Sequence, residues 1–468
     1  MYKKTKDLPY KKLPKPTRIQ KIIGPSFIIL GLGLGSGEVI MWPYLASNYG
    51  MGIIWGAIIG ITLQFFINME IERYALARGE SIFVGYKRLF VWAPFWFILS
   101  TFIPWMWPGI AASSATLLGE VFGIGNTKLF AIVLLVAMGA ILSLGPVLYK
   151  TVENLQKILI IFGVPAIFII SLLLAGKSDW IAASQGIVGN GDGFWFLPAG
   201  ISLAAFLAAL AYAGAGGNLN LAQSFYVKEK GFGMGKYSGR ITSLLNKKKE
   251  KINLEGFQFR INKQSVSDFN KWWKVINTEH FIVFWLTGGI TIVLLSLLAF
   301  VTVYSNGSSG ANINFVIQES QAIGKMLIPA VGTFFLIVTG LTLFGTQLTV
   351  FDATSRIITE NIAIIKSGSI STKNIPKIYY FVLWLQITAG IIILSLGYDQ
   401  PLQLLILAAV LNAFAMFVHT GMTLFLNTKE LPKEIAPNKF RKAAMTAAFI
   451  FYGSFSLFVI ITEINKLL

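Results

Sequence analysis

Long apolar runs separated by short polar segments make up most of this sequence. A helix needs about 20 mostly apolar residues to cross a bilayer, and eleven runs approach or exceed this length. They cover roughly residues 22–47, 51–71, 92–119, 128–148, 156–175, 194–227, 280–304, 326–360, 377–397, 402–426 and 442–464. The pattern predicts an all-α polytopic membrane protein with about eleven transmembrane helices.

Lysine and arginine are concentrated in every second connecting segment. If the N-terminus is cytoplasmic and the spans alternate, all but four of the 39 basic residues fall in or beside cytoplasmic segments. The exceptions are Lys128, Lys177, Lys325 and Lys466. Cytoplasmic loops of membrane proteins carry such an excess. The distribution predicts a cytoplasmic N-terminus and an external C-terminus, in the cell (plasma) membrane because no organelle address is visible.

Composition narrows the classes of function. Apolar residues make up 55% of the chain and charged residues 13%, about half the charged share of soluble domains. The net charge of +18 comes from basic residues in the segments between the spans, so we attribute it to membrane topology and expect no nucleic acid as a partner. The expected partners are membrane lipid, a small ion or solute as substrate, and possible protons. The chain has no cysteine and two histidines. We find no catalytic cluster and no nucleotide motif, so we expect neither an enzyme nor a cofactor.

The first and sixth spans contain closely spaced glycines followed by polar residues. Each glycine costs a helix about 1 kcal/mol relative to alanine, so both helices should break, and a break must face protein or a water-filled cavity. The alternative is that these glycines only allow close helix packing. The residues concerned are Gly31, Gly33, Gly35, Gly37 and Glu38 in the first span, and Gly214, Gly216, Gly217, Asn218 and Asn220 in the sixth.

The two breaks are five helices apart, so their spans cross the membrane in opposite directions. This spacing is typical of a 5+5 inverted repeat, as in leucine-transporter-like folds, with one helix appended. The expected organisation is a basic cytoplasmic arm at 1–21, a first repeat at 22–175, a second repeat at 194–426 with a cytoplasmic insertion at 228–279, and an eleventh helix at 442–464.

The cytoplasmic insertion contains many basic residues and the pair Trp272-Trp273. One interpretation is a basic loop with an amphipathic segment resting on the inner leaflet. The other is a regulatory or partner-binding element. We interpret Trp272 as a residue of the membrane interface or of packing.

Glu38 is the one acid well inside the apolar part of the first span. An ionised group at mid-bilayer costs at least about 2.5 kcal/mol, which makes it a functional candidate. Three roles stay open: a cation ligand, a proton carrier, or an anchor for the broken backbone. Asp352 and Arg356 are four residues apart in the eighth span and should either pair along the helix or act as a gate.

Short motifs stand along the chain at Gly24-Pro25-Ser26-Phe27, Gly37-Glu38, Leu63-Gln64, Glu72-Arg73-Tyr74-Ala75, Gly79-Glu80-Ser81 and Asn218-Leu219-Asn220-Leu221. They resemble motifs of the Nramp family of proton-coupled divalent-metal transporters, within the amino-acid, polyamine and organocation superfamily. The eleven-helix layout is also similar over nearly the whole chain.

The family's metal-binding motifs are changed in this chain. Its Asp-Pro-Gly-Asn motif corresponds to Gly35, Ser36, Gly37 and Glu38, and its Met-Pro-His motif to Ala215, Gly216 and Gly217. The remaining oxygen ligands would suit a hard cation such as Mg²⁺ or Mn²⁺.

The resemblance implies a secondary transporter, by alternating access, of a divalent metal cation, with Glu38 as its metal ligand. The alternative is a transporter of a small organic solute such as an amino acid or amine. In either case the predicted substrate-binding residues are Gly35, Ser36, Gly37, Glu38, Ala215, Gly216, Gly217, Asn218 and Asn220, completed by Gln347 and Asn412.

Overall fold

A computed structural model describes residues 7–16, 25–144, 148–238, 254–306, 312–366 and 374–467. Within these ranges, ten helices are long and apolar enough to cross a membrane. The sixth expected span is not among them because its helix is broken into two short pieces, α10 (Leu203–Ala211) and α11 (Gln223–Lys230). Ten long helices plus this broken one agree with the predicted all-α polytopic architecture.

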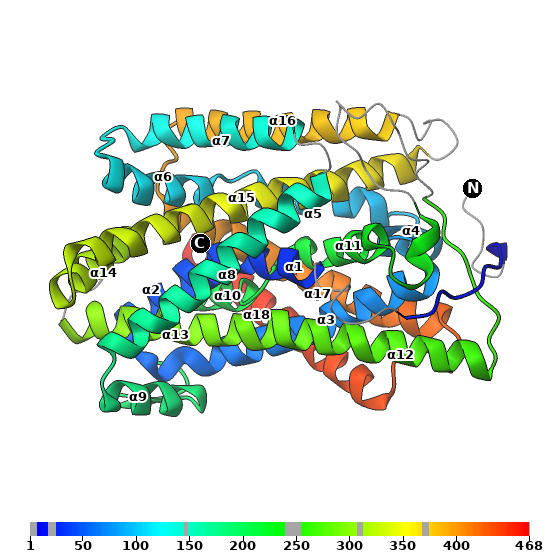
Figure 1. Ribbon diagram of the computed structural model, residues 1–468, viewed down its shortest axis with the longest axis horizontal. Helices are drawn as coiled ribbons and strands as arrows, with labels where there is room; N and C mark the ends of the chain where they lie inside the picture. The colour runs from blue at the N-terminus through cyan, green and yellow to red at the C-terminus, as the bar shows by residue number, and fades with distance from the viewer. Residues whose placement is uncertain are drawn as a thin grey trace.

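The helices run side by side in a long bundle (Figure 1). The first half contains α1 (Pro25–Gly33), η3 (Leu34–Met41), α2 (Trp42–Tyr49), η4 (Met51–Ile53), α3 (Ile54–Arg78), α4 (Ile82–Leu89), α5 (Ala93–Trp105), α6 (Gly109–Phe122), α7 (Thr127–Leu144), α8 (Leu148–Leu174) and α9 (Lys177–Ile187). A small antiparallel pair, β1 (Asn190–Gly191) and β2 (Phe194–Trp195), follows.

The second half contains α10, η5 (Gly217–Ala222), α11, η6 (Gly233–Tyr237), α12 (Lys263–His280), η7 (Phe281–Leu286), α13 (Thr287–Thr302), η8 (Tyr304–Asn306), α14 (Asn314–Met326), α15 (Pro329–Ile365), α16 (Ile375–Ser395), α17 (Pro401–Glu430) and α18 (Lys439–Leu467). The described N-terminal segment, α4 and α12 lie at one end of the bundle, whereas α9 and α14 lie at the other (Figure 1).

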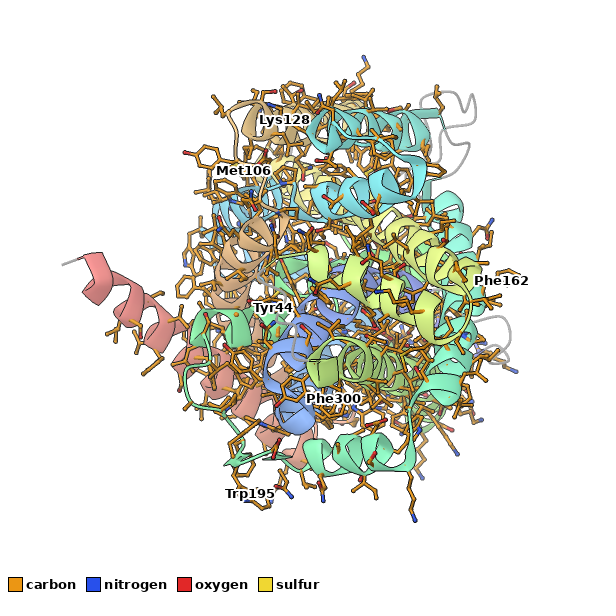
Figure 2. The ribbon with its side chains drawn as sticks, turned by 90° about the vertical axis from the view of Figure 1, so that its left-hand side faces the viewer. Tyr44, Met106, Lys128, Phe162, Trp195 and Phe300 are labelled. Carbon is orange, nitrogen blue, oxygen red and sulfur yellow. The ribbon has the colours of Figure 1, made fainter. Side chains whose placement is uncertain are left out.

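The outer surface of the bundle is apolar, as a lipid-facing surface must be. Phe162 on α8 is 72% exposed and lies on the rim when the bundle is seen end-on (Figure 2). Leu129 and Leu144 on α7 and Leu457 on α18 are also exposed. Helices with this surface would aggregate in water, so the exposed residues support the membrane assignment independently of span length.

The first span differs from the expected break because it stays helical throughout. Its glycine-rich part, η3, is a π-helix between α1 and α2. In a π-helix each N–H bonds to a carbonyl five residues away, which widens the helix, and such segments are rare and frequently functional. The glycines therefore loosen the α-helix without unwinding it.

The third span carries an interruption that the sequence analysis did not predict. Helices α5 and α6 are separated by Met106, Trp107 and Pro108. Proline cannot donate a backbone hydrogen bond and disfavours helical geometry at the residue before it. Pro108 was therefore an available signal for this interruption.

The segment predicted as an insertion at 228–279 also differs from the expected amphipathic segment lying on a membrane surface. Its described helix α12 continues through η7 into α13 as one helix of 40 residues, Lys263–Thr302. At 1.5 Å per residue this helix is about 60 Å long, twice the thickness of the hydrocarbon core. Helix α12 therefore extends the seventh span away from the membrane. Residues 239–253 of the insertion lie outside the described residues.

Trp272 and Trp273 belong to this extension and pack against protein. Trp272 stacks near Phe232, with ring centroids 5.7 Å apart, and its indole nitrogen donates to the Pro14 carbonyl at 2.7 Å. This contact ties α12 to the described part of the N-terminal arm. Packing rather than a lipid interface thus explains Trp272.

Candidate functional site

The π-helical part of the first span packs directly against the break in the sixth span. A Cβ atom on Gly37 would overlap the backbone oxygen of Tyr212, and one on Gly33 would lie 2.7 Å from the backbone of Gly214. Gly35 faces α15 instead, where a Cβ would overlap the Thr346 side chain. Alternating glycines therefore bring this backbone against two other spans.

The break in the sixth span needs glycine at three positions. Gly214, Gly216 and Gly217 have φ angles of 145°, 74° and 56°, which residues with a Cβ rarely adopt. Gln64 on α3 spans the break: its amide nitrogen donates to the Ala211 carbonyl at 3.0 Å, and its oxygen accepts from Gly216 N at 3.2 Å. The predicted break is confirmed, and one side chain stabilises both of its edges.

Polar and aromatic side chains of the third and tenth spans surround the break. Asn218 donates to the hydroxyls of Ser100 at 2.8 Å and Thr101 at 3.0 Å. Asn412 on α17 donates to the Tyr212 hydroxyl at 3.2 Å. The ring of Trp105, the last residue of α5, lies 5.6 Å from that of Tyr212. The interrupted third span thus supplies one wall.

His419 is one further contact with the break. Its Nε2 atom lies 3.0 Å from the Gly217 carbonyl, and the ring is fully buried. This distance indicates a hydrogen bond that holds the tenth span on the sixth. The sequence analysis did not include His419 in the site.

Many polar atoms in this region are buried and have no hydrogen-bond partner among the described residues. Natural proteins leave few such atoms, and each calls for an explanation such as water or a ligand. They include Ser36 Oγ, both carboxylate oxygens of Glu38, Oδ1 of Asn218, both amide atoms of Asn220, Oδ1 of Asn412, Nδ1 of His419 and Nε1 of Trp105. This concentration of unpaired polar atoms marks the region as a candidate binding site.

Glu38 points toward the seventh span. A Cβ on Gly288 of α13 would lie 3.2 Å from the Glu38 Oε1 atom and 2.7 Å from Ile61 Cδ1. The neighbouring residue Gly37 faces Tyr212 in the break. The carboxylate therefore lies beside α3 and α13.

The eighth span lies against the first, as the predicted site requires. Thr346 Oγ1 donates to the Gly31 carbonyl at 2.8 Å. Gln347, the next residue, is buried. The predicted residues Gly35, Ser36, Ala215 and Gly216 are buried as well, so the whole region is closed to solvent in this conformation.

At the end of the bundle that carries α12, Arg356 links two spans. Its Nε atom lies 2.9 Å from both carboxylate oxygens of Asp352, which confirms the pairing along the helix. Its Nη1 atom also pairs with Glu229 on α11, and the Tyr379 hydroxyl donates to Asp352 at 2.8 Å. The pair thereby fastens α11, the second half of the sixth span, to the eighth and ninth spans.

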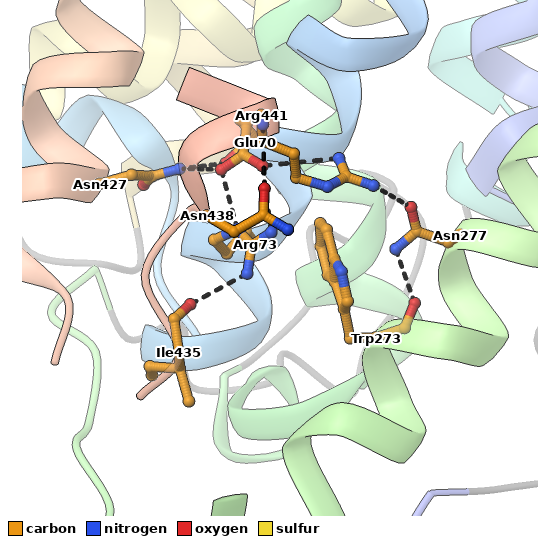
Figure 3. Close-up of polar contacts among 8 residues, drawn as sticks. All are labelled: Glu70, Arg73, Trp273, Asn277, Asn427, Ile435, Asn438 and Arg441. Carbon is orange, nitrogen blue, oxygen red and sulfur yellow. Dashed lines mark hydrogen bonds and ion pairs between the residues drawn. The ribbon is translucent and has the colours of Figure 1, made fainter. Parts of the chain in front are cut away.

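A second buried ion cluster lies at the same end (Figure 3). Glu70 bonds Arg73 at 2.8 Å, accepts from Asn427 at 3.0 Å and lies 3.5 Å from Arg441. The Trp273 ring stacks between the two guanidinium groups, 3.8 Å from Arg73 and 4.7 Å from Arg441. The cluster joins the second, tenth and eleventh spans to α12.

The sequence analysis predicted neither the Arg356 cluster nor the Glu70 cluster in full. Within the motifs that carry the family resemblance, Glu72-Arg73 and Gly79-Glu80 were noted, but Glu70, Glu229 and Arg441 were not. Acids at the ends of apolar spans were the available signal. Their partners lie up to several hundred residues away in the sequence, so no spacing rule could identify them.

The donor set around the break contains amide, hydroxyl and backbone oxygens and the imidazole of His419. In the described residues, no three His, Cys, Asp or Glu side chains lie close enough to hold a metal ion together. A hard cation could use carbonyl and amide oxygens, and the aromatic wall could accept an organic solute.

Comparison with known proteins shows the fold. No protein-family model and no curated protein sequence matches the chain. A manganese transporter from Eremococcus coleocola, solved as a mutant, matches with a TM-score of 0.72 and 13% identity over 99% of this chain and 91% of the other. The same transporter in complex with an aromatic bis-isothiourea compound matches with a TM-score of 0.70 and 13% identity, over 98% and 90%.

Mhp1, a nucleobase-cation-symport-1 family transporter in a closed conformation with bromovinylhydantoin bound, matches with a TM-score of 0.54 and 12% identity, over 96% and 95%. Near full-length agreement at such low identity means that the chain shares a transporter fold while its side chains differ widely.

Proposed function

We propose that this protein is a secondary transporter that moves its substrate by alternating access. The observation that carries the proposal is the break in the sixth span packed on the π-helix of the first, with unpaired oxygens buried beside both. Interrupted helices in corresponding halves are the usual place of a transporter's central site. The fold shared with the manganese transporter and Mhp1 supports the same function.

We propose a divalent metal cation as the substrate. Similarity to a manganese transporter over nearly the whole chain favours a metal, although 13% identity carries only the fold. Without sulfur or imidazole at the positions of the family motifs, the oxygens of Asn218, Asn220, Asn412 and Ser36 would favour a hard cation such as Mn²⁺ or Mg²⁺.

A small organic solute is the second candidate. The observation in its favour is the Trp105–Tyr212 ring pair next to the Asn412 amide, since organic ligands bind in pockets with apolar walls and few polar groups. Mhp1 shares the fold and was solved with an organic ligand.

We propose that the Arg356 and Glu70 clusters form the closed inner gate. Both lie at the end of the bundle that carries the basic arm and α12, which positive-inside placement puts in the cytoplasm. The C-terminus would be external, the membrane would be the cell membrane, and protons would be the coupling ion. Opening the gate requires the ion pairs to exchange protein partners for water.

The test is uptake of Mn²⁺ and Mg²⁺ into proteoliposomes, with and without an inward proton gradient. We expect saturable uptake that the gradient accelerates. The control variant is Glu319→Gln, which replaces a buried acid on α14, outside the spans, and should leave uptake unchanged. Folded protein that takes up neither metal above the level of protein-free liposomes would exclude the metal substrate.

The second candidate substrate, a small organic solute, is tested with a separate variant. Trp105→Leu removes the aromatic wall and should weaken binding of an organic solute while leaving metal affinity nearly unchanged. Amines and amino acids would be screened by thermal shift of the purified protein. A solute that stabilises the parent protein but not Trp105→Leu would establish the second candidate.

A further inference from the structure

His419 lies on the side of α17 that faces the break in the sixth span. It follows Asn412 by seven residues, or about two helical turns, so both side chains leave the helix on the same side. Asn412 donates to the Tyr212 hydroxyl at 3.2 Å, and the Nε2 atom of His419 lies 3.0 Å from the Gly217 carbonyl oxygen. The tenth span therefore covers the break with one amide and one imidazole.

The contact with Gly217 fixes the position of the hydrogen on the ring. A carbonyl oxygen only accepts hydrogen bonds, so Nε2 must carry the hydrogen and donate it. The ring is fully buried, and Nδ1 has no hydrogen-bond partner among the described residues. An imidazolium would bury a second N–H and a positive charge without an acceptor for either, which is costly. His419 is therefore neutral, with an unshared electron pair on Nδ1.

The other hydrogen bonds at His419 go to its backbone. The hydroxyls of Tyr86 and Thr423 donate to the His419 carbonyl oxygen, at 3.4 Å and 2.7 Å. They attach α4 and the next turn of α17 to the helix backbone and leave the ring alone. Packing of the tenth span thus explains Nε2 and the carbonyl, but it does not explain the buried electron pair of Nδ1.

Amides with unpaired atoms surround the same short helix. Helix η5 begins at Gly217, contains Asn218 and Asn220, and packs on α17. Oδ1 of Asn218, both amide atoms of Asn220 and Oδ1 of Asn412 have no partner among the described residues. Nδ1 is therefore one of several unpaired acceptors where α17 meets η5. Oxygen ligands completed by an imidazole nitrogen suit a divalent transition-metal ion.

The Gly217 carbonyl has the place of a supporting group behind a metal-binding histidine. Imidazoles that bind metals almost always donate their other N–H to a carboxylate, a backbone carbonyl or water, which fixes the tautomer and the orientation of the ring. Here the backbone of the break, where Gly217 has a φ of 56°, supplies that acceptor. Nδ1 is consequently left as the nitrogen that can bind a ligand.

We propose that Nδ1 of His419 is a nitrogen ligand of the transported cation. This inference rests on the proposed metal substrate and narrows its class to transition metals. Imidazole binds first-row transition-metal ions, with an affinity that rises from Mn²⁺ to Co²⁺, whereas Mg²⁺ takes oxygen ligands and water. His419 therefore makes the site prefer Mn²⁺ to Mg²⁺, although both ions fit its oxygens.

Nitrogen NMR of the metal-free protein, labelled with nitrogen-15 in histidine, tests the state of the ring. The chain contains two histidines, His280 and His419, so His280→Gln leaves the signals of His419 alone. We expect a neutral ring with its hydrogen on Nε2. A hydrogen on Nδ1 would leave no electron pair for a metal ion there and would overturn the proposal.

Electron spin-echo spectroscopy of bound Mn²⁺ tests the ligand itself. We expect coupling to an imidazole nitrogen in the parent protein and in His280→Gln, and its loss in His419→Gln. The glutamine amide can reach the position of Nε2 and donate to the Gly217 carbonyl, but it has no counterpart of Nδ1. Mn²⁺ affinity should fall by about tenfold or more in this variant, since even loss of a supporting partner costs about 10–100-fold. Mg²⁺ affinity, measured by competition, should stay nearly unchanged.

The outcomes separate a ligand from a packing contact. Unchanged stability with lost preference for Mn²⁺ in His419→Gln would establish the ligand, whereas lost stability with retained preference would make His419 a packing contact and overturn the proposal. Mn²⁺ bound by the parent protein without nitrogen coupling, or coupling that persists in His419→Gln, would also overturn it and leave the metal substrate intact. A folded parent protein that binds neither Mn²⁺ nor Mg²⁺ would exclude the proposed substrate and this ligand together.

Discussion

Gly37→Ala should separate the first span from the break and destabilise the protein. A Cβ at this position would overlap the backbone oxygen of Tyr212 and would lie 3.0 Å from the Tyr212 Cβ. A backbone oxygen in a buried turn cannot rotate away as a flexible side chain can. Overpacking a core costs about 1–3 kcal/mol, and the backbone obstacle places this substitution near the upper end.

Gly289→Ala provides the matched control on the seventh span. A Cβ there would meet nothing within 4 Å, so the substitution should be neutral or stabilise the helix by up to about 1 kcal/mol. The two glycine-to-alanine variants should therefore differ by roughly 2–4 kcal/mol in free energy of unfolding.

The measurement is reversible unfolding in mixed micelles, followed by tryptophan fluorescence, with substrate uptake as a second readout. We expect Gly37→Ala to lose stability and uptake together, because the π-helix and the break form one packed unit. A Gly37→Ala protein within about 0.5 kcal/mol of the parent, the usual range for harmless substitutions, would refute the close contact between these backbones.

Three further predictions concern Arg356 in the proposed gate, Gln64 at the break and Glu319 on α14. Arg356→Gln leaves Asp352 and Glu229 buried without their cation and should lower the free energy of unfolding by about 3–5 kcal/mol. Equilibrium unfolding measures this loss. Faster labelling of a cysteine introduced just inside the proposed gate would show that the gate opens more readily. Gln64→Leu removes both hydrogen bonds across the break and should cost about 2–6 kcal/mol, at about 1–3 kcal/mol for each of the two buried groups left unpaired. A loss no larger than that of Ser184→Ala, which removes an exposed hydroxyl, would contradict this. Burial raises the pKa of Glu319 well above its usual 4.5, so the folded protein holds this proton more tightly than the unfolded chain and stability falls as pH rises above about 4.5. Glu319→Gln should therefore stabilise the protein at neutral pH but not below pH 4.5, and thermal unfolding across pH that shows no such crossover would contradict the burial effect.

Part of the candidate site could be predicted from the sequence because its signals are local. Gly214, Gly216 and Gly217 adopt positive φ angles in a break that their spacing predicted, and Asn218 follows it directly. Asp352 and Arg356 pair as their four-residue spacing predicted. Each of these inferences uses residues within one or two turns of one another.

Other parts of the site could not be predicted in this way. The bridge from Gln64 and the stacking of Trp273 between Arg73 and Arg441 depend on contacts between spans distant in sequence. An apolar pattern specifies that a helix crosses the membrane, but not which neighbour each face meets.

The orientation of the Glu38 side chain best separates what the sequence determines from what the tertiary structure determines. Hydrophobic length, charge distribution and glycine content are properties of short segments, so the sequence by itself determined the spans, their expected sidedness and the weak points of the first and sixth helices. Only the tertiary structure decided that the first span keeps a π-helix. One π turn accommodates an extra residue, which rotates the following side chains by about 100° relative to an α-helix. In this π-helix the Glu38 carboxylate lies against Gly288 of the seventh span while Gly37 lies against the break. No local pattern specifies either contact, because both partners are distant in the sequence.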